Sequence, residues 1–189
     1  MATVTVTLKS TAPYSQSKAY VSEKDPNESY PDFEARCWHE HLHIDGKDNV
    51  YIPARAFQEA LLAAAAFNGK KIKGRGNATY AVRFQRGVRP DGAGMVIGKP
   101  ADFRREVIWA HAQPSNRKKS PRVYRSYPTI DEWQGTMKFW VTDPLITKDI
   151  FVEMLKEAGC HNGVGRYRVE NGGLYGCWEI AENGVKWES

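Results

Sequence analysis

The chain has 189 residues, of which 41% are hydrophobic and 12% aromatic, which excludes a disordered chain and fits one globular domain with a real core. The formal net charge of +5 favours polyanionic partners. The three cysteines, Cys37, Cys160 and Cys177, are too few and too widely spaced for a disulfide framework. No apolar run approaches the ~18 residues of a membrane span. We therefore expect a cytoplasmic protein without a membrane partner.

The first third of the chain contains one clear strand and one clear helix. Residues 2–8 alternate between valine or leucine and threonine, which predicts a strand. Residues 11–31 are polar and turn-rich, and residues 33–43 are compatible with either a helix or a strand. Asp45-Gly46 marks a turn before residues 50–52. Pro53 suits the first position of the following helix, which we expect to end at Gly69.

The remaining elements show either the two-residue alternation of a strand or the three-to-four-residue spacing of a helix. Alternation predicts strands over residues 80–88, 105–112, 134–142 and 174–181. Thr147 is expected to cap a helix that runs through Ala158 and ends at Gly159, because apolar residues recur there every three or four positions. Residues 182–189 are expected to form a tail.

The strong elements have the order strand, helix, strand, strand, helix, strand. This order predicts an α+β, ferredoxin-like βαββαβ core with an antiparallel sheet. The chain contains no internal repeat and no linker that would divide it. We therefore expect a single domain over residues 1–189, with its core at 1–89 and 129–189 and an insertion at about 90–128.

Basic side chains gather in two stretches. The first, residues 69–90, contains no acidic residue, and the second lies inside the predicted insertion, where Tyr124 and Tyr127 are interleaved. Such stretches also occur on ordinary solvated faces, but two of them together favour contacts with phosphates. The candidate nucleic-acid-binding residues from these stretches are Lys70, Lys71, Lys73, Arg75, Arg83, Arg117, Lys118, Lys119, Arg122 and Arg125.

Residues 159–176 form a glycine-rich segment between the last helix and the last strand. Arg166, Tyr167 and Arg168 lie in its middle. Glycine permits a close backbone approach to a partner, and arginine and tyrosine provide phosphate forks and stacking faces. We therefore add these three residues to the candidate nucleic-acid-binding site. The alternative is a mobile connection between helix and strand.

Residues 37–43 suggest a different chemistry. Cys37, His39, His41 and His43 alternate, and thiolate and imidazole are good zinc ligands. Four ligands spread along an extended strand are nevertheless too far apart for one tetrahedral ion. We expect no metal and no other cofactor, and we keep a metal-dependent nuclease that uses this cluster as an alternative function.

Several short motifs resemble the RAMP superfamily, the RNA-binding backbone subunits of CRISPR effectors, and more closely small phage- and prophage-borne relatives. The motifs are Thr11-Ala-Pro13, Tyr51-Ile-Pro-Ala-Arg-Ala-Phe57, Tyr127-Pro-Thr-Ile-Asp-Glu-Trp133, Gly163-Val-Gly-Arg-Tyr-Arg168 and Gly172-Gly-Leu-Tyr-Gly176. One departure is Val169, where the family pattern would have proline.

The resemblance implies subunits that line up along a single strand and contact mainly its backbone. Arg166 and Arg168 fall in the matching glycine-rich loop. The leading hypothesis is therefore a non-enzymatic protein that binds single-stranded RNA or DNA and forms a homo-oligomer or filament on it. A second alternative is a phage protein-interaction factor that mimics or competes with a CRISPR backbone subunit and has CRISPR-related protein partners.

Overall fold

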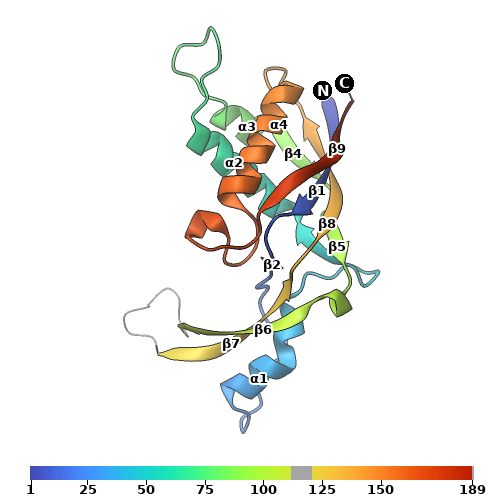
Figure 1. Cartoon of the computed structure of the whole chain (residues 1–189), viewed down its shortest axis with the longest axis vertical. Helices are drawn as coiled ribbons and strands as arrows, with labels where there is room; N and C mark the ends of the chain where they lie inside the picture. Colours follow the sequence, from blue (N-terminus) through green and yellow to red (C-terminus); the bar gives the residue numbers. More distant parts are fainter. Residues whose placement is uncertain (112–120, 189) are drawn as a thin grey trace.

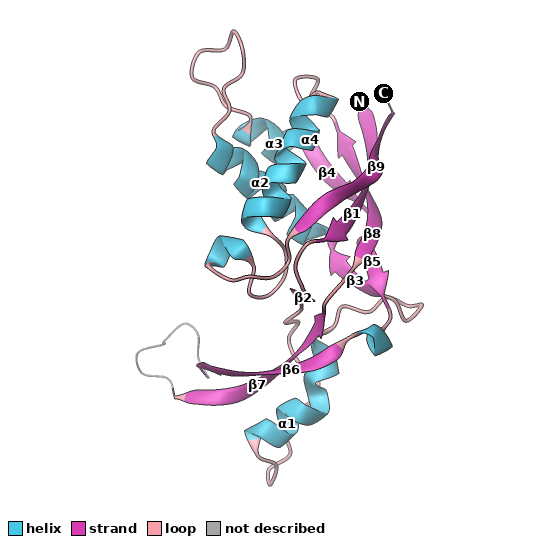
Figure 2. Ribbon diagram, viewed as in Figure 1, coloured by secondary structure: helices cyan, strands magenta, loops and turns pink. Residues whose placement is uncertain are grey.

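The computed structural model describes residues 1–111 and 121–188. Its main body is a four-stranded antiparallel sheet with strand order β4-β8-β1-β9. Three helices, α2, α3 and α4, cover one face of this sheet (Figures 1 and 2). The bounds of these elements are β1 Ala2–Ser10, α2 Ala54–Asn68, α3 Ala81–Gly87, β4 Val88–Asp91, β8 Gln134–Val141, α4 Lys148–Glu157 and β9 Trp178–Glu188.

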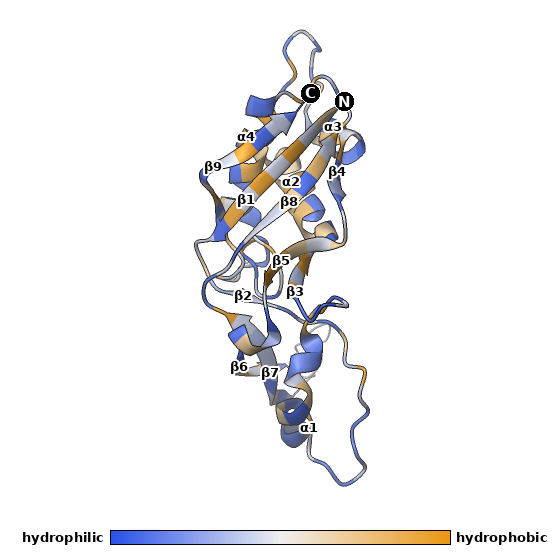
Figure 3. Cartoon of the chain, turned by 90° about the vertical axis from the view of Figure 1, so that its right-hand side faces the viewer, coloured by the Kyte–Doolittle hydropathy of each residue, from blue (hydrophilic) through white to orange (hydrophobic). Residues whose placement is uncertain are grey.

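This arrangement confirms the predicted ferredoxin-like core. The chain passes through β1, α2, β4, β8, α4 and β9, and β1 lies between β8 and β9 with antiparallel pairing to both. Alternation along β1 directs Val4, Val6 and Leu8 into the core, where all three are fully buried. Figure 3 shows the opposite, open face of the sheet, to which the threonines of β1 contribute.

The helices bury their apolar sides against the sheet. Phe151 of α4 packs edge-on against Phe139 of β8, with ring centroids 5.4 Å apart. Phe57 of α2 contacts Trp178 of β9 in a similar way at 5.5 Å. The Thr147 side chain accepts a hydrogen bond from the Ile150 N–H, and Gly69 ends α2 in the left-handed region at φ 62°. Both predicted helix boundaries are thereby confirmed.

A second part of the molecule extends from one end of this body. It is a three-stranded sheet of order β2-β7-β6 with a short helix beside it, and a two-stranded sheet, β3-β5, lies between it and the main sheet. The bounds are β2 Tyr14–Ser15, α1 Tyr30–Cys37, β3 Val50–Pro53, β5 Gly94–Gly98, β6 Arg104–His111 and β7 Arg122–Ile130. The predicted insertion at about 90–128 thus contains β5, β6 and most of β7.

Four local predictions need correction. Residues 81–87 form α3 and not a strand, because a helix of about two turns buries Phe84 while Val82 faces solvent, and the strand β4 starts only at Val88. Helix α4 does not end at Gly159 but continues as a π-helical turn, Ala158–Asn162. A Cβ at Gly159 would lie 2.3 Å from the Trp178 carbonyl oxygen, so this glycine permits a close contact and does not stop the helix.

The last strand and the start of α2 also differ from prediction. Strand β9 begins at Trp178 and includes residues 182–188 of the predicted tail. Asn183, at φ 52°, and Gly184 form an irregularity inside the strand and do not end it, and Ser189 lies outside the described residues. Pro53 precedes α2 and does not occupy its first position. The ambiguous residues 33–43 form the end of α1 and a 3₁₀ turn, Trp38–His41.

Candidate nucleic-acid interface

Strands β6 and β7 form a ribbon that projects from the body (Figure 1). The two strands pair from Arg104 with Thr129 to His111 with Arg122. Because successive side chains of a strand point to opposite faces, the ribbon has two distinct faces. Arg105, Val107 and Trp109 share one face, which we call the outer face, and Glu106 lies on the other, inner face.

The outer face combines exposed aromatic and basic side chains. Trp109 and Tyr124 are directly opposite in the register, are 54% and 55% exposed, and have ring centroids 4.6 Å apart. Val107 is 48% exposed, and Arg105 and Arg122 are also exposed. Large aromatic side chains this exposed need a reason, because most such rings are buried. The two rings are tilted by 60° against each other, and exposed aromatic rings beside guanidinium groups are suited to base stacking combined with phosphate contact.

The inner face connects the ribbon to the glycine-rich segment through Glu106. Its Oε2 accepts hydrogen bonds from Arg166 Nη2 at 2.7 Å and from the Thr129 hydroxyl at 3.0 Å. Its Oε1 accepts one from the Tyr175 hydroxyl at 2.6 Å. This bond to a carboxylate, together with burial, raises the pKa of Tyr175. Three elements distant in sequence therefore meet at one carboxylate.

Arg166 is largely buried in this junction. Its Nε donates a hydrogen bond to Ser15 Oγ at 3.0 Å, and its guanidinium lies 4.2 Å from the centroid of the Tyr127 ring. With only 15% of its side chain exposed, it serves mainly to hold the glycine-rich segment against the ribbon. Arg168 is more open and pairs with Glu170 at 2.8 Å.

The glycine-rich segment is tightly folded on itself. Gly176 has φ 77°, and a Cβ there would lie 1.9 Å from the Val164 carbonyl oxygen. Tyr167 adopts a positive φ of 60°, a conformation that is costly for a residue with a side chain. Its ring is 52% exposed and meets Tyr175 edge-on at 5.5 Å. The fold thus presents Tyr167 to solvent and turns Arg166 inward.

The remaining candidate residues fall in other places. Lys70 forms an ion pair with Glu153, Arg83 pairs with Asp143 at 3.1 Å, and Lys73 and Arg75 are exposed. Lys71 donates a hydrogen bond to Asn77 at 3.1 Å. The loop between α2 and α3, which holds all of these basic residues except Arg83 of α3, lies at the opposite end of the molecule from the ribbon (Figure 1). The two basic stretches therefore do not form one continuous cluster. Arg117, Lys118 and Lys119 lie outside the described residues.

Within residues 37–43, Cys37 and His41 are buried and have structural roles, whereas His39 is exposed. His41 lies 4.2 Å from the Tyr20 ring and stacks on Tyr127 at 4.9 Å, and its Nδ1 is bonded to the Lys18 carbonyl oxygen. Burial lowers the pKa of His41. Cys37 is buried, and no group of three or more potential metal ligands occurs within residues 1–111 and 121–188. The nuclease alternative therefore has no ligand cluster in this part of the chain.

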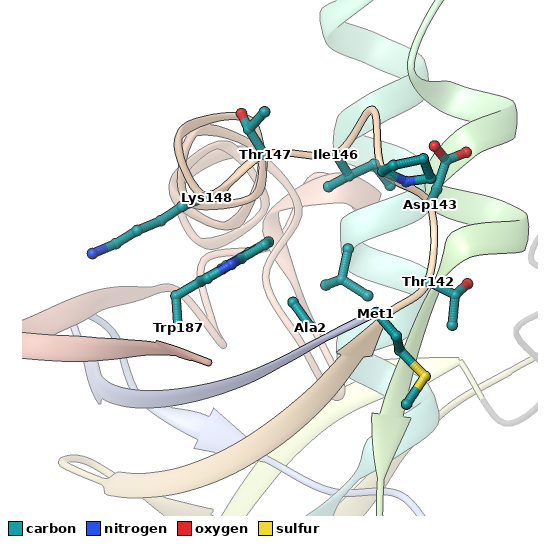
Figure 4. Close-up of a pocket in the computed structure, with 10 residues that line it drawn as sticks. Met1, Ala2, Thr142, Asp143, Ile146, Thr147, Lys148 and Trp187 are labelled. Carbon is teal, nitrogen blue, oxygen red and sulfur yellow. The ribbon is translucent and has the colours of Figure 1, made fainter. Parts of the chain in front are cut away.

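Figure 4 shows a pocket of about 310 Å³ near the two ends of the chain. It lies between the start of β1, the end of β9 and the segment that enters α4. Asp143, one of its ionisable residues, already forms an ion pair with Arg83 and accepts a hydrogen bond from the Leu145 N–H. The pocket therefore offers no free acid–base pair, and it lies far from the ribbon.

Sequence reasoning missed Arg105, Val107 and Trp109. The alternation of these residues within a correctly predicted strand already indicated that they share one face. What was lacking was the register that places Trp109 against Tyr124 and the exposure of that face. Glu106 was missed for a similar reason, since its partners come from distant segments.

Comparison with known proteins gives a likeness in fold. The chain is similar to one in the cryo-EM structure of the type III-B Cmr-beta complex bound to cognate target RNA, with a TM-score of 0.53 and 14% identity. The match covers all of this chain and 61% of that chain. No family model and no curated protein matches. None of the described helices is long and apolar enough to cross a membrane. The likeness shows that this chain shares its fold with a chain in the structure of Cmr-beta bound to target RNA.

Proposed function

We propose that this protein binds single-stranded nucleic acid without catalysing a reaction, and that several copies assemble along the strand. The observation that carries the proposal is the exposed Trp109–Tyr124 pair on the outer face of the ribbon, between Arg105 and Arg122. The likeness in fold to a chain of an RNA-bound complex and the net charge of +5 support it. The RAMP resemblance of the sequence motifs implies RNA binding, and we include that implied function in the proposal.

The proposed roles follow from exposure and existing partners. Trp109, Tyr124 and Tyr167 stack on bases, and Arg105, Arg122 and Arg168 contact phosphates, with Arg117, Lys118 and Lys119 as further contacts from the sequence. Arg166 and Arg125 hold the ribbon in place through Glu106 and Glu34. At the opposite end, Lys71, Lys73 and Arg75 contact a strand that extends beyond one copy, whereas Lys70 and Arg83 are already paired with Glu153 and Asp143.

The charge distribution supports assembly of copies in one direction. Residues 20–41, which include α1 beside the ribbon, contain six acidic and two basic residues (Glu23, Asp25, Glu28, Asp32, Glu34 and Glu40; Lys24 and Arg36). The basic loop after α2 lies at the other end of the molecule (Figure 1). The ribbon beside α1 also carries Arg105 and Arg122, so the charge at that end is mixed. We therefore propose a head-to-tail contact only between the acidic segment 20–41 of one copy and the basic loop of the next.

The test is a fluorescence-anisotropy titration with labelled single-stranded RNA, single-stranded DNA and duplex, at low and moderate salt. The protein should bind single strands more tightly than duplex. Trp109→Ala should weaken binding by roughly 5- to 100-fold, given about 1–3 kcal/mol for a stacked base. Phe67→Ala is the matched control, because Phe67 is 79% exposed on α2 and outside the ribbon. Equal affinity of Trp109→Ala and wild type would refute the assigned surface.

The same samples test the alternatives. Incubation of the strands with protein and Mg²⁺, Mn²⁺ or Zn²⁺ should leave them intact, and cleavage that chelation abolishes would establish a nuclease. The second candidate is a protein-interaction factor, favoured by the likeness to a chain of a multi-protein assembly. Binding to a CRISPR effector complex without any affinity for nucleic acid would support it.

A further inference from the structure

A cleft of about 530 Å³ lies between α1 and β7. Its walls are largely aromatic, with Tyr20, Tyr30 and Phe33 on one side and Tyr124 on the other, and Glu34 and Arg125 lie within it. A volume of this size is in the range of ligand sites, about 300–1,000 Å³. The cleft adjoins the outer face of the ribbon, because Tyr124 both lines the cleft and pairs with Trp109.

The polar groups of the cleft are arranged for a ligand with hydrogen-bonding edges. The Glu34 carboxylate forms an ion pair with Arg125 and accepts the Ser126 N–H at 2.6 Å, and only 6% of its side chain is exposed. The buried Tyr20 hydroxyl also lies beside the Glu34 carboxylate, and burial, together with this neighbour, raises the pKa of Tyr20. An ionised carboxylate has about four acceptor positions on its two oxygens, so a donor on a bound ligand would add a further hydrogen bond to Glu34.

A nucleobase matches both properties of the cleft. It is flat and stacks on aromatic rings, and its edge carries donors and acceptors. A carboxylate accepts hydrogen bonds from amino groups such as N4 of cytosine, whereas uracil presents carbonyl oxygens on both sides of its one imino group. The anionic Glu34 therefore favours a base that carries an exocyclic amino group.

We infer that the cleft between α1 and β7 is a base-binding subsite that takes an amino-bearing base, cytosine or a purine, from the strand on the ribbon. This inference rests on the proposed function. It adds a preference among bases to a surface that would otherwise contact only phosphates and stack on any base. Tyr30, 67% exposed at the start of α1, forms the accessible wall of the subsite.

The experiment compares oligo-C with oligo-U of equal length by anisotropy, using wild type, Tyr30→Ala and Phe67→Ala. Wild type should bind oligo-C more tightly than oligo-U. Tyr30→Ala should lose at least ~5-fold in affinity for oligo-C and much less for oligo-U, since one stacking wall is removed. Phe67→Ala should behave as wild type. Circular dichroism shows whether each variant is folded.

A second variant tests the hydrogen-bonding edge. Glu34→Gln keeps an acceptor for the Ser126 N–H but adds donors that suit uracil, so the ratio of oligo-C to oligo-U affinity should fall. Because this ratio comes from one protein sample, partial unfolding does not change it. Binding of both oligomers with equal affinity by all variants, while Trp109→Ala is impaired, would overturn the subsite and leave the proposed function standing.

Two other results would also overturn the subsite, each for a different reason. If wild type binds no single strand at low salt, the proposed function fails and the subsite fails with it. If Tyr30→Ala changes the oligomeric state in multi-angle light scattering but leaves both affinities unchanged, the cleft accommodates a neighbouring copy. That result would also overturn the subsite.

Discussion

At the scale of single residues, His41 gives the junction between ribbon and body a dependence on pH. It is 4% exposed, and the groups that face it are Tyr20 from the N-terminal segment, Glu34 from α1, Tyr127 and Arg125 from β7 and Arg166 from the glycine-rich segment. Burial is the largest cause of its lowered pKa, and it outweighs the hydrogen bond to the Lys18 carbonyl oxygen and the charge of Glu34, which raise the pKa. The two arginines act in the same direction as burial. The folded protein therefore favours the neutral imidazole.

This depressed pKa predicts a loss of stability on mild acidification. As pH falls below ~6.5, the ordinary histidine value, the unfolded chain binds a proton that the folded chain does not, so the free energy of unfolding decreases. Urea denaturation at pH 7.5, 6.5 and 5.5 measures this decrease. His41→Phe should reduce it, with His39→Phe, at an exposed position, as the control. An unchanged slope in His41→Phe would contradict the assignment.

Gly172 and Gly176 have nearly equal φ, so substituting each of them distinguishes the cost of backbone strain from the cost of a steric clash. Gly172, at φ 75°, has nothing within 4 Å of an added Cβ, whereas a Cβ at Gly176, at φ 77°, would meet the Val164 carbonyl oxygen. Gly172→Ala should cost about 1–2 kcal/mol from backbone strain alone. Gly176→Ala should cost at least ~2 kcal/mol more, because the loop must shift. Thermal or urea unfolding of both variants gives the comparison, and equal costs would show that the loop relaxes freely.

At the scale of elements, the Arg166–Glu106 pair decides how the glycine-rich segment is oriented. Arg166→Ala leaves Glu106 without its cation and removes the contact with Tyr127. We expect a loss of roughly 2–3 kcal/mol, below the range for fully buried pairs, because both side chains are partly exposed. A double-mutant cycle with Glu106→Gln should give a coupling of about 1 kcal/mol or more.

The matched control for this cycle is the neighbouring pair Arg168–Glu170. Its side chains are 34% and 36% exposed, so Arg168→Ala should cost no more than about 1 kcal/mol. A coupling near zero for Arg166 and Glu106 would show that the segment is held by its backbone contacts. Those include the hydrogen bond from the Arg166 N–H to the Ser15 carbonyl oxygen.

The elements that the sequence predicts correctly have strong local signals. Strand β1 alternates without interruption, and α4 has both a capping threonine and an apolar side. The failures have weak or conflicting signals. Alternation of Tyr80, Val82 and Phe84 resembles a strand, but Phe84 alone is fully buried and Val82 is 53% exposed, so a helical turn satisfies the core equally well. Asn183 and Gly184 resemble a turn but form an irregularity within β9.

At the scale of the whole molecule, the candidate site depends on contacts that local patterns do not contain. The sequence singled out Arg166 for phosphate binding because it lies among glycines, yet Glu106, some sixty residues earlier, binds its guanidinium. Trp109 received no functional assignment, and only the pairing of β6 with β7 shows that it faces outward beside Tyr124. Charge and composition indicated the type of ligand, while the pairing of distant segments decides which side chains are free to meet it.

The long shape of the molecule, with the ribbon at one end and the basic loop at the other, predicts how salt will affect binding. For single strands, each phosphate contact contributes ~0.7 to the slope of log affinity against log salt. Replacing Arg105 and Arg122 by alanine should reduce that slope by about 1.4 on any strand, because both flank the stacking pair.

The basic loop should matter only when the strand is long enough to reach it. Replacing Lys71, Lys73 and Arg75 by alanine should leave the slope unchanged on a short oligomer that fills the ribbon of one copy, and reduce it on a long one. Titrations over a series of salt concentrations with both lengths measure the four slopes. A reduced slope on the short oligomer would mean that the strand binds at the loop, whereas unchanged slopes on both would restrict the interface to the ribbon. Length dependence is thus the property that distinguishes a strand lying along the whole molecule from one held at a single end.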